Sequence, residues 1–169
     1  MDSPITIESA KPGDAQALLE IHAAAVHRTA APYYSQKILD NWARRPITSD
    51  RVERVKQRWI ENPDHRIVVA KHNSQVVGFG FIDGHGQLQG LYVHPDYGRC
   101  GIGANLLAAL EQAAVALGLK HLQADASLNA EGFYRKQGFD VIEPGVHRLG
   151  SGQEIACIKM RKPLVNHEQ

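Results

Sequence analysis

The residues best suited to chemistry lie in a glycine-rich turn at 98–103, with the sequence GRCGIG. A predicted strand ends just before this turn at Pro95, and a stretch with helical periodicity follows Gly103. Such a turn directs several backbone N–H groups outward, and the start of the helix adds partial positive charge. Because glycines let a ligand approach the backbone closely, the turn is suited to binding a pyrophosphate.

Two common nucleotide-binding motifs fit this turn poorly. A Walker A loop needs Lys and then Ser or Thr after its second glycine, where this chain has Ala104 and Asn105. The dinucleotide fingerprint fits Gly101 and Gly103, but Leu106 occupies the place of the third glycine. The sequence therefore predicts neither an NTPase nor a dinucleotide-binding unit. A plain strand-to-helix connection stays open as the alternative to a ligand site.

The flanking sequence predicts the elements that position the turn. Apolar alternation and turn residues predict strands at about 4–10, 66–71, 76–82, 87–94, 121–127, 139–148 and 154–161. Helical periodicity and capping residues predict helices at about 12–29, 35–45, 49–62, 103–118 and 130–137. The strand–helix–strand unit from 87 to 127 requires a parallel pair with a right-handed crossover, whereas the hairpins are antiparallel. We therefore expect a mixed sheet in an α+β or α/β fold.

Composition limits the class of protein. The 169 residues, 43% of them hydrophobic and 22% charged, predict one globular domain over 1–169 with a frayed tail at 164–169. A net charge of +1 argues against nucleic-acid and membrane partners. Without a signal peptide or an apolar span, a cytoplasmic protein is predicted, in which Cys100 and Cys157 are reduced thiols. The nine histidines show no metal-ligand spacing, so no metal is predicted.

A second segment gives the glycine turn a family context. Val93-x-Pro95 followed by Gly98-x-x-Gly101-x-Gly103 resembles the acyl-CoA-binding motif of the GNAT N-acetyltransferases. Downstream, A-x-x-F-Y-x-x-x-G-F at 130–139 resembles the second motif of that family. The resemblance covers 65–162 well and the first 64 residues by element order. It implies a mixed, mostly antiparallel twisted sheet of about six or seven strands flanked by helices, with a parallel β-α-β unit at the CoA site.

The resemblance also implies a co-substrate, acetyl-CoA, and the residues that would bind it. The backbone of Leu91, Tyr92 and Val93 would pair with the pantetheine arm as an added strand would. Asn129 would contact the same arm, and Tyr134 would protonate the departing thiolate. The pyrophosphate would be held by the backbone amides of Gly98, Arg99, Cys100, Gly101, Ile102, Gly103 and Ala104.

The chain departs from the family pattern at two places. Gly98 stands where Gln or Arg is usual, although Arg99 supplies a positive charge beside it. Many members carry an acidic residue that helps deprotonate the amine, where this chain has Gln87 or Gln89. Neither glutamine can act as a base. The candidates that stay open are a water relay, an amine that loses its proton in solution, and the side chains of Asp83, His85 and Asp125.

The predicted function is direct transfer of acetyl from acetyl-CoA to a primary amine of a small molecule or peptide. Tyr33, Tyr34 and Trp42 could wall the acceptor pocket or could simply pack between helices. The alternative is an acyl-CoA sensor without efficient turnover, which the missing base motivates. A toxin-like enzyme acting on charged tRNA would usually have a basic surface, which the composition does not show. The closing strands leave a homodimer open as a further partner.

Overall fold

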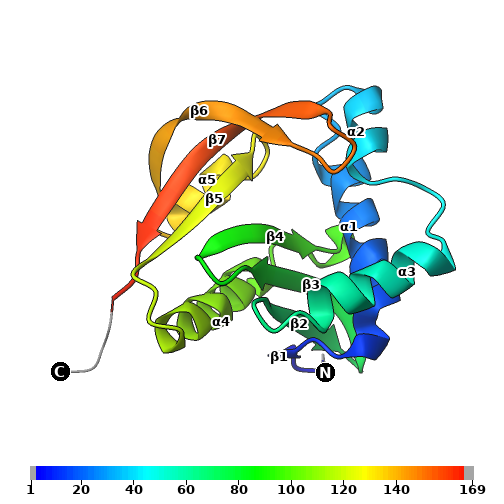
Figure 1. Cartoon of the computed structure of the whole chain (residues 1–169), viewed down its shortest axis with the longest axis horizontal. Coiled ribbons are helices and arrows are strands. Elements are labelled where there is room, and N and C mark those ends of the chain that lie inside the picture. The colour runs from blue at the N-terminus through cyan, green and yellow to red at the C-terminus, as the bar shows by residue number, and fades with distance from the viewer. Residues whose placement is uncertain (1–2, 166–169) are drawn as a thin grey trace.

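The strands form one seven-stranded sheet in the computed structural model, which describes residues 3–165 (Figure 1). The strands are β1 (Thr6–Ser9), β2 (Arg66–His72), β3 (Gln75–Ile82), β4 (Gln87–Val93), β5 (His121–Ser127), β6 (Asp140–Arg148) and β7 (Glu154–Pro163). Their order across the sheet is β1-β2-β3-β4-β5-β7-β6. Neighbours are antiparallel except β4 and β5, which are parallel. The predicted mixed, mostly antiparallel sheet is confirmed.

The helices lie close to their predicted positions, with one difference in the third. They are α1 (Ala15–Thr29), α2 (Gln36–Trp42), α3 (Ser49–Val55), α4 (Ile102–Ala116) and α5 (Glu131–Lys136), with short helical turns η1 (Pro12–Asp14), η2 (Lys56–Ile60) and η3 (Pro95–Tyr97). The third helix was expected to continue to about residue 62. Instead α3 ends at Val55 and η2 is a wider π-type turn, in which the Glu61 amide donates to the Lys56 carbonyl at 2.9 Å.

The first four strands are packed between helices on both faces. Strand side chains alternate between faces, so Val69 and Phe79 pack with Leu18 of α1 in one apolar cluster. On the opposite face, Ala70 and Val77 pack with residues of α4. Burial of the larger of these side chains, each worth about 1.5–3 kcal/mol, stabilises the half of the sheet that supports the ends of β4 and α4.

The parallel pair β4 and β5 separates after only two residue pairs. Gln87 lies opposite Gln123 and Leu88 opposite Ala124, and beyond them the strands diverge (Figure 1). At the same point β4 has a β-bulge. Phe81 of β3 pairs with Gly90, but the following residue of β3, Ile82, pairs with Leu88, so that one residue of β4 is left over. The extra residue is Gln89, and a bulge of this kind bends its strand and re-aims side chains.

The second half of the sheet is a hairpin of β6 and β7 that continues from β5 (Figure 1). The hydroxyl of Tyr34 donates to the Ala156 carbonyl of β7 at 2.7 Å and accepts from the Leu128 amide at 2.9 Å. Tyr34 therefore ties the segment between α1 and α2 to this half. Tyr34 is buried, while Tyr33 is 54% exposed.

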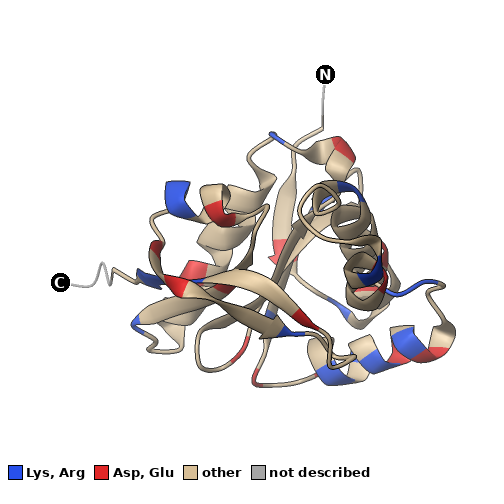
Figure 2. Cartoon of the chain, turned by 90° about the horizontal axis from the view of Figure 1, so that it is seen from above, with Lys and Arg blue, Asp and Glu red and all other residues tan. Residues whose placement is uncertain are grey.

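The surface carries charges of both signs. Lys and Arg alternate with Asp and Glu over the outer elements, in keeping with the net charge of +1 (Figure 2).

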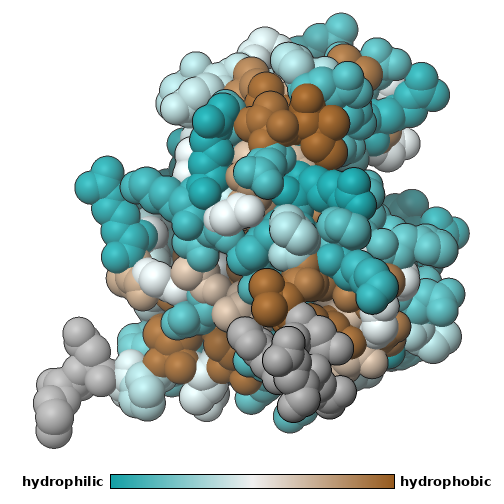
Figure 3. Space-filling view, turned by 90° about the vertical axis from the view of Figure 1, so that its left-hand side faces the viewer, coloured by the Kyte–Doolittle hydropathy of each residue, from teal (hydrophilic) through white to brown (hydrophobic). Residues whose placement is uncertain are grey.

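Apolar residues are gathered in patches on the end of the molecule that Figure 3 views. The exposed apolar side chains of the edge strand β6 are Val141, Ile142 and Val146. A homodimer stays a prediction.

Two further sequence predictions concern the termini and membranes. Residues 166–169 of the expected tail lie outside the described residues, and the Leu164 amide at its start donates to the Lys120 carbonyl at 2.8 Å. Within residues 3–165, the helices are all too short or too polar to cross a bilayer. The cytoplasmic location stays a prediction of the sequence.

We predict that Gly86→Ala destabilises the fold at the end where β4 and β5 are paired. Gly86 has φ of +90°, and an added Cβ would lie 2.5 Å from the His121 carbonyl oxygen. The Gly86 carbonyl also accepts from the Gln123 amide at 2.9 Å. Backbone strain plus this clash should lower the free energy of unfolding by about 2–4 kcal/mol in chemical denaturation.

The matched control is Gly118→Ala. Gly118 has φ of +80° with no atom within 4 Å of the added Cβ, so it reports the cost of the backbone conformation alone. Equal losses in the two variants would show that the strand contact at Gly86 is unimportant.

Candidate active site

The divergence of β4 and β5 leaves backbone groups of β4 without a neighbouring strand. The His94 amide donates to the Val77 carbonyl at 2.8 Å, which fixes the alternation of the antiparallel pair. The backbone of Tyr92 therefore faces β3, whereas the N–H and C=O groups of Leu91 and Val93 face the divergence. Of the three residues predicted to pair with a pantetheine arm, Leu91 and Val93 offer backbone groups, and Tyr92 contributes its side chain.

Three adjoining cavities open along this divergence. A groove of about 360 Å³ runs between the end of α1, the end of β4 and the segment 127–130. A junction of about 70 Å³ lies between β4 and β5 and includes Tyr134. A chamber of about 170 Å³ continues beneath the β6–β7 hairpin. Trp42 and Tyr92 line all three cavities, so the groove, the junction and the chamber adjoin one another, and together they are called the path below.

The predicted phosphate turn lies at the groove end of this path. Gly101, with φ of +76°, precedes α4, and the side chain of Ile102 is buried against Ala70 and Val77. Ile102 therefore anchors the helix start while the first amides of the 15-residue α4 have no partner within their own helix. Arg99 is exposed and also has positive φ, at 65°. This arrangement gives the start of α4 the free amides and the neighbouring positive charge expected of an anion site.

The turn and the second motif are in contact. Gly103 lies so close to the ring of Phe133 that a Cβ there would be 3.3 Å from it. A glycine at this position lets α5 pack against the start of α4. The contact places Tyr134, the next residue along α5, in the wall of the junction.

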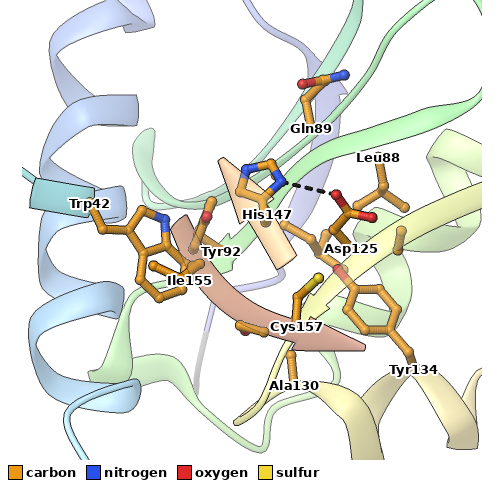
Figure 4. A pocket seen from close by; sticks show the side chains of 14 residues that line it. Trp42, Leu88, Gln89, Tyr92, Asp125, Ala130, Tyr134, His147, Ile155 and Cys157 are labelled. Carbon is orange, nitrogen blue, oxygen red and sulfur yellow. Dashed lines mark hydrogen bonds and ion pairs between the residues drawn. The ribbon is translucent and has the colours of Figure 1, made fainter. Parts of the chain in front are cut away.

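Tyr134 is buried with its ring between two phenylalanines. The ring centroids of Phe133 and Phe139 lie 5.3 and 5.2 Å from the ring centroid of Tyr134, in edge-to-face contacts. In Figure 4 its hydroxyl points into the junction, on the side where Asp125 and Cys157 lie. Burial raises the pKa of the Tyr134 hydroxyl above its usual value, because the charged phenolate would be poorly solvated. The hydroxyl therefore keeps its proton at neutral pH.

Asn129 lines the groove with an unsatisfied buried oxygen. Its Oδ1 is buried and has no hydrogen-bond partner within the described chain. A buried polar atom without a partner costs about 1–3 kcal/mol, so such an atom at the wall of a groove is suited to a ligand that donates a hydrogen bond. The pantetheine arm has amide N–H groups of this kind.

The three candidate bases lie in two different places. Asp83 and His85 belong to the turn between β3 and β4, away from the cavities. Asp83 is engaged there, because its carboxylate accepts from the amides of His85 and Gln87 and from the Gln89 side chain, at 2.9, 3.0 and 3.1 Å. Asp125 lines the junction.

Asp125 is held by two side chains of the β6–β7 hairpin. Its Oδ2 lies 3.0 Å from Nδ1 of His147 (Figure 4). Its Oδ1 accepts from Nζ of Lys159 at 3.4 Å. His147 lines both the junction and the chamber. Sequence reasoning missed His147, because the two residues are 22 positions apart and meet only through the pairing of three strands.

The chamber is walled mainly by aromatic rings. The rings of Tyr92 and His22 make an edge-to-face contact with their centroids 4.8 Å apart, and the ring centroids of Trp59 and Phe81 are 5.2 Å apart. Trp42, at the end of α2, completes the wall on the groove side. Burial is the main cause that lowers the pKa of His22 to about 4 and raises that of Tyr92 to about 12. Both groups are therefore uncharged at neutral pH.

Neither cysteine is in a disulfide. Cys100 is exposed in the phosphate turn, and its Sγ lies 3.6 Å from the Gly98 carbonyl. Cys157 is buried in β7 at the junction, and burial is the main cause that raises the pKa of its thiol. A raised pKa disfavours the thiolate, which is the nucleophilic form.

Solved structures of acetyltransferases have folds similar to this one. A GCN5-related N-acetyltransferase from Rhodopseudomonas palustris is 27% identical with a TM-score of 0.83, covering 97% of this chain and 98% of that one. YncA of Salmonella typhimurium, solved with its cofactor acetyl-CoA, is 26% identical with a TM-score of 0.69, covering 99% and 98%. PaiA N-acetyltransferase of Thermoplasma acidophilum, solved with coenzyme A, shares the fold at 21% identity and a TM-score of 0.72, covering 95% and 99%.

Sequence comparison identifies the family. No curated protein matches the chain significantly. The model of the acetyltransferase (GNAT) domain matches residues 29–164, which include both motifs and the whole of the divergent strand pair. The chain therefore belongs to the GNAT family of acetyltransferases and is an acyltransferase.

Proposed function

We propose that this protein transfers the acetyl group of acetyl-CoA directly to a primary amine, with residues 1–169 acting as one catalytic domain. The observation that carries the proposal is the row of adjoining cavities from the groove beside the phosphate turn, past Tyr134, to an aromatic chamber. A two-substrate reaction needs a site at each end of such a path and the reacting atoms in the middle.

The groove fits the CoA part of acetyl-CoA. The unpaired N–H and C=O groups of Leu91 and Val93 can bind the pantetheine arm as a further strand would. The buried Oδ1 of Asn129 can accept from an amide of that arm. The backbone amides of 99–104 and the Arg99 side chain can hold the pyrophosphate. Gly98 was also expected to contribute its amide, but that amide donates to the Pro95 carbonyl at 3.3 Å. Acetyl-CoA would supply an activated acyl group as a thioester.

The junction would hold the thioester. A backbone amide there, from Leu91 or Val93, can donate to the carbonyl oxygen as it gains negative charge in the transition state. Tyr134 keeps its proton at neutral pH and can donate it to the sulfur that leaves. Holding both substrates in one path also removes much of the entropic cost of their meeting.

The chamber would bind the amine. Its rings favour an acceptor with an apolar body, and the face of a tryptophan also attracts an ammonium group by about 0.5–2 kcal/mol. His22 is neutral at pH 7 and does not repel a cation. Within the described chain, the chamber lining contains no carboxylate to pair with a second ammonium group. These features favour a monoamine over a polyamine.

A panel of amines tests the proposed function. With acetyl-CoA saturating, thiol release should be faster with phenethylamine than with spermidine, by at least about tenfold in kcat/KM. The reason is that the chamber offers apolar contact but few partners for several charges. Tight binding of acetyl-CoA without transfer to any amine, including a peptide N-terminus and a lysine side chain, would contradict the enzyme and favour the acyl-CoA sensor.

We predict that Tyr134→Phe lowers kcat at least about tenfold, because the thiolate then leaves without a proton donor. The dissociation constant of acetyl-CoA should change by less than about twofold, because the ring and its packing remain. Steady-state kinetics and calorimetric titration measure the two quantities. Tyr33→Phe, on an exposed ring, is the matched control. Full kcat in Tyr134→Phe would remove Tyr134 from the chemistry.

We predict that His22 makes stability depend on pH. Its folded-state pKa of about 4 lies below the unfolded value of 6.5, so the unfolded state takes up a proton first as the pH falls. Stability from His22 is therefore complete above pH 6.5 and lost toward pH 4, by up to about 3 kcal/mol.

Chemical denaturation of His22→Phe against wild type at pH 7 and pH 4.5 measures this contribution. The phenyl ring keeps the edge contact with Tyr92, so the variant should lose less stability than wild type on acidification. The control is His85→Phe on the exposed turn. An identical loss in wild type and His22→Phe would contradict the prediction.

A further inference from the structure

We propose that His147 is the general base of the reaction, with Asp125 as its positioning residue. The inference rests on the proposed function and completes it, because neither motif supplies a group that takes the proton of the amine. Gln89, at the bulge of β4, lines the same cavities but cannot accept a proton at neutral pH.

The position of His147 matches that role. Its side chain lines the junction, where the thioester would lie, and also the chamber, where the amine would lie. The other candidates fail this geometric requirement. Asp125 lines the junction alone, His22 lines the chamber alone, and Asp83 with His85 lies outside both.

The bond to Asp125 sets the form of the imidazole. A carboxylate can only accept, so Nδ1 of His147 carries the hydrogen of the 3.0 Å contact. In the neutral ring Nε2 then has the lone pair and is the basic atom. Asp125 is fixed in turn by Lys159 of β7 at 3.4 Å. The same carboxylate also stabilises the imidazolium that forms when Nε2 takes a proton.

The charged and titratable groups around His147 come from several elements. Asp125 lies on β5, and Lys159 and Cys157 lie on β7. Across the cavities are Tyr134 of α5, Tyr92 of β4 and His22 of α1. At neutral pH the raised pKa values of the two tyrosines and the thiol and the lowered pKa of His22 leave these four uncharged. Asp125 is therefore the negative charge that faces His147, and Lys159 lies on its other oxygen.

The ammonium of the bound amine first gives a proton to Nε2 of His147, which passes it to water. The neutral nitrogen then forms a bond to the carbonyl carbon, the carbon–sulfur bond breaks, and the electron pair goes to sulfur. The nitrogen, acidic once it carries the acyl group and a positive charge, loses its second proton to water, and the thiolate takes the proton of Tyr134. Water then returns a proton to Tyr134, so that one proton is released overall. The products are the N-acetylated amine and CoA with a free thiol.

Two amines of different basicity test the inference with His147→Gln. Phenethylamine is protonated at pH 7 and needs a base, whereas the nitrogen of O-benzylhydroxylamine is already neutral. We expect His147→Gln to lose at least about tenfold in kcat/KM with phenethylamine and less than about threefold with O-benzylhydroxylamine. An equal loss with both amines would indicate a merely structural role and would overturn the proposal.

The pH profile gives a second readout. Wild-type kcat/KM with phenethylamine should rise with pH and then reach a plateau, because a base in the site and not the solution removes the proton of the amine. In His147→Gln it should keep rising about tenfold per pH unit, because only the amine that is neutral in solution reacts. Asp125→Asn should show the same amine dependence, because the ring loses the negative charge that fixes its form and stabilises its imidazolium.

Controls separate this inference from the proposed function. His147 is 45% exposed, so the variant should fold, which an unchanged thermal midpoint and acetyl-CoA affinity would confirm. His85→Gln, on the turn, should behave as wild type. If His147→Gln kept the full activity of the wild type, the role of His147 would be overturned, while the proposed function would stand. A wild-type protein that neither binds acetyl-CoA nor acetylates an amine would overturn the proposed function as well.

Discussion

The site depends on the separation of two parallel strands. β4 and β5 are held together at two residue pairs and then part, which leaves strand edges inside a folded domain. Backbone N–H and C=O groups need partners, so an inner edge of this kind is costly unless a ligand or water completes it. The bulge at Gln89 decides which residues present that edge, because it shifts the alternation so that Leu91 and Val93 face the opening.

The rest of the structure keeps this opening in place. The first four strands are fixed by helices on both faces, and Ile102 anchors the phosphate turn to them. On the other side, Tyr34 joins the segment before α2 to β7 and to the end of β5. Phe133 packs on Gly103, so the helix with Tyr134 moves with the helix that begins at the phosphate turn. Well-packed elements around an open cavity suit a reaction whose rate depends on how the two substrates are positioned.

Much of the fold could be predicted from the sequence because its signals are local. Strand alternation, helix periodicity and the glycines of two motifs each occupy a few consecutive residues. The position of Tyr134 followed from its motif. The bulge at Gln89 and the contact of His147 with Asp125 could not be predicted, because each depends on the register between strands far apart in sequence. The π-type turn after Val55 likewise replaces a helix end that the pattern alone extends.

The most direct measurement is an amide NMR titration of the labelled protein with acetyl-CoA, with ATP and NADH as controls. If the open edge of β4 binds the pantetheine arm, the amides of Leu91 and Val93 should shift and exchange more slowly with solvent, together with those of 99–104. The Tyr92 amide, which faces β3, should change much less. The account would be contradicted if acetyl-CoA left Leu91 and Val93 unchanged at saturation, or if ATP produced the same shifts at these two amides.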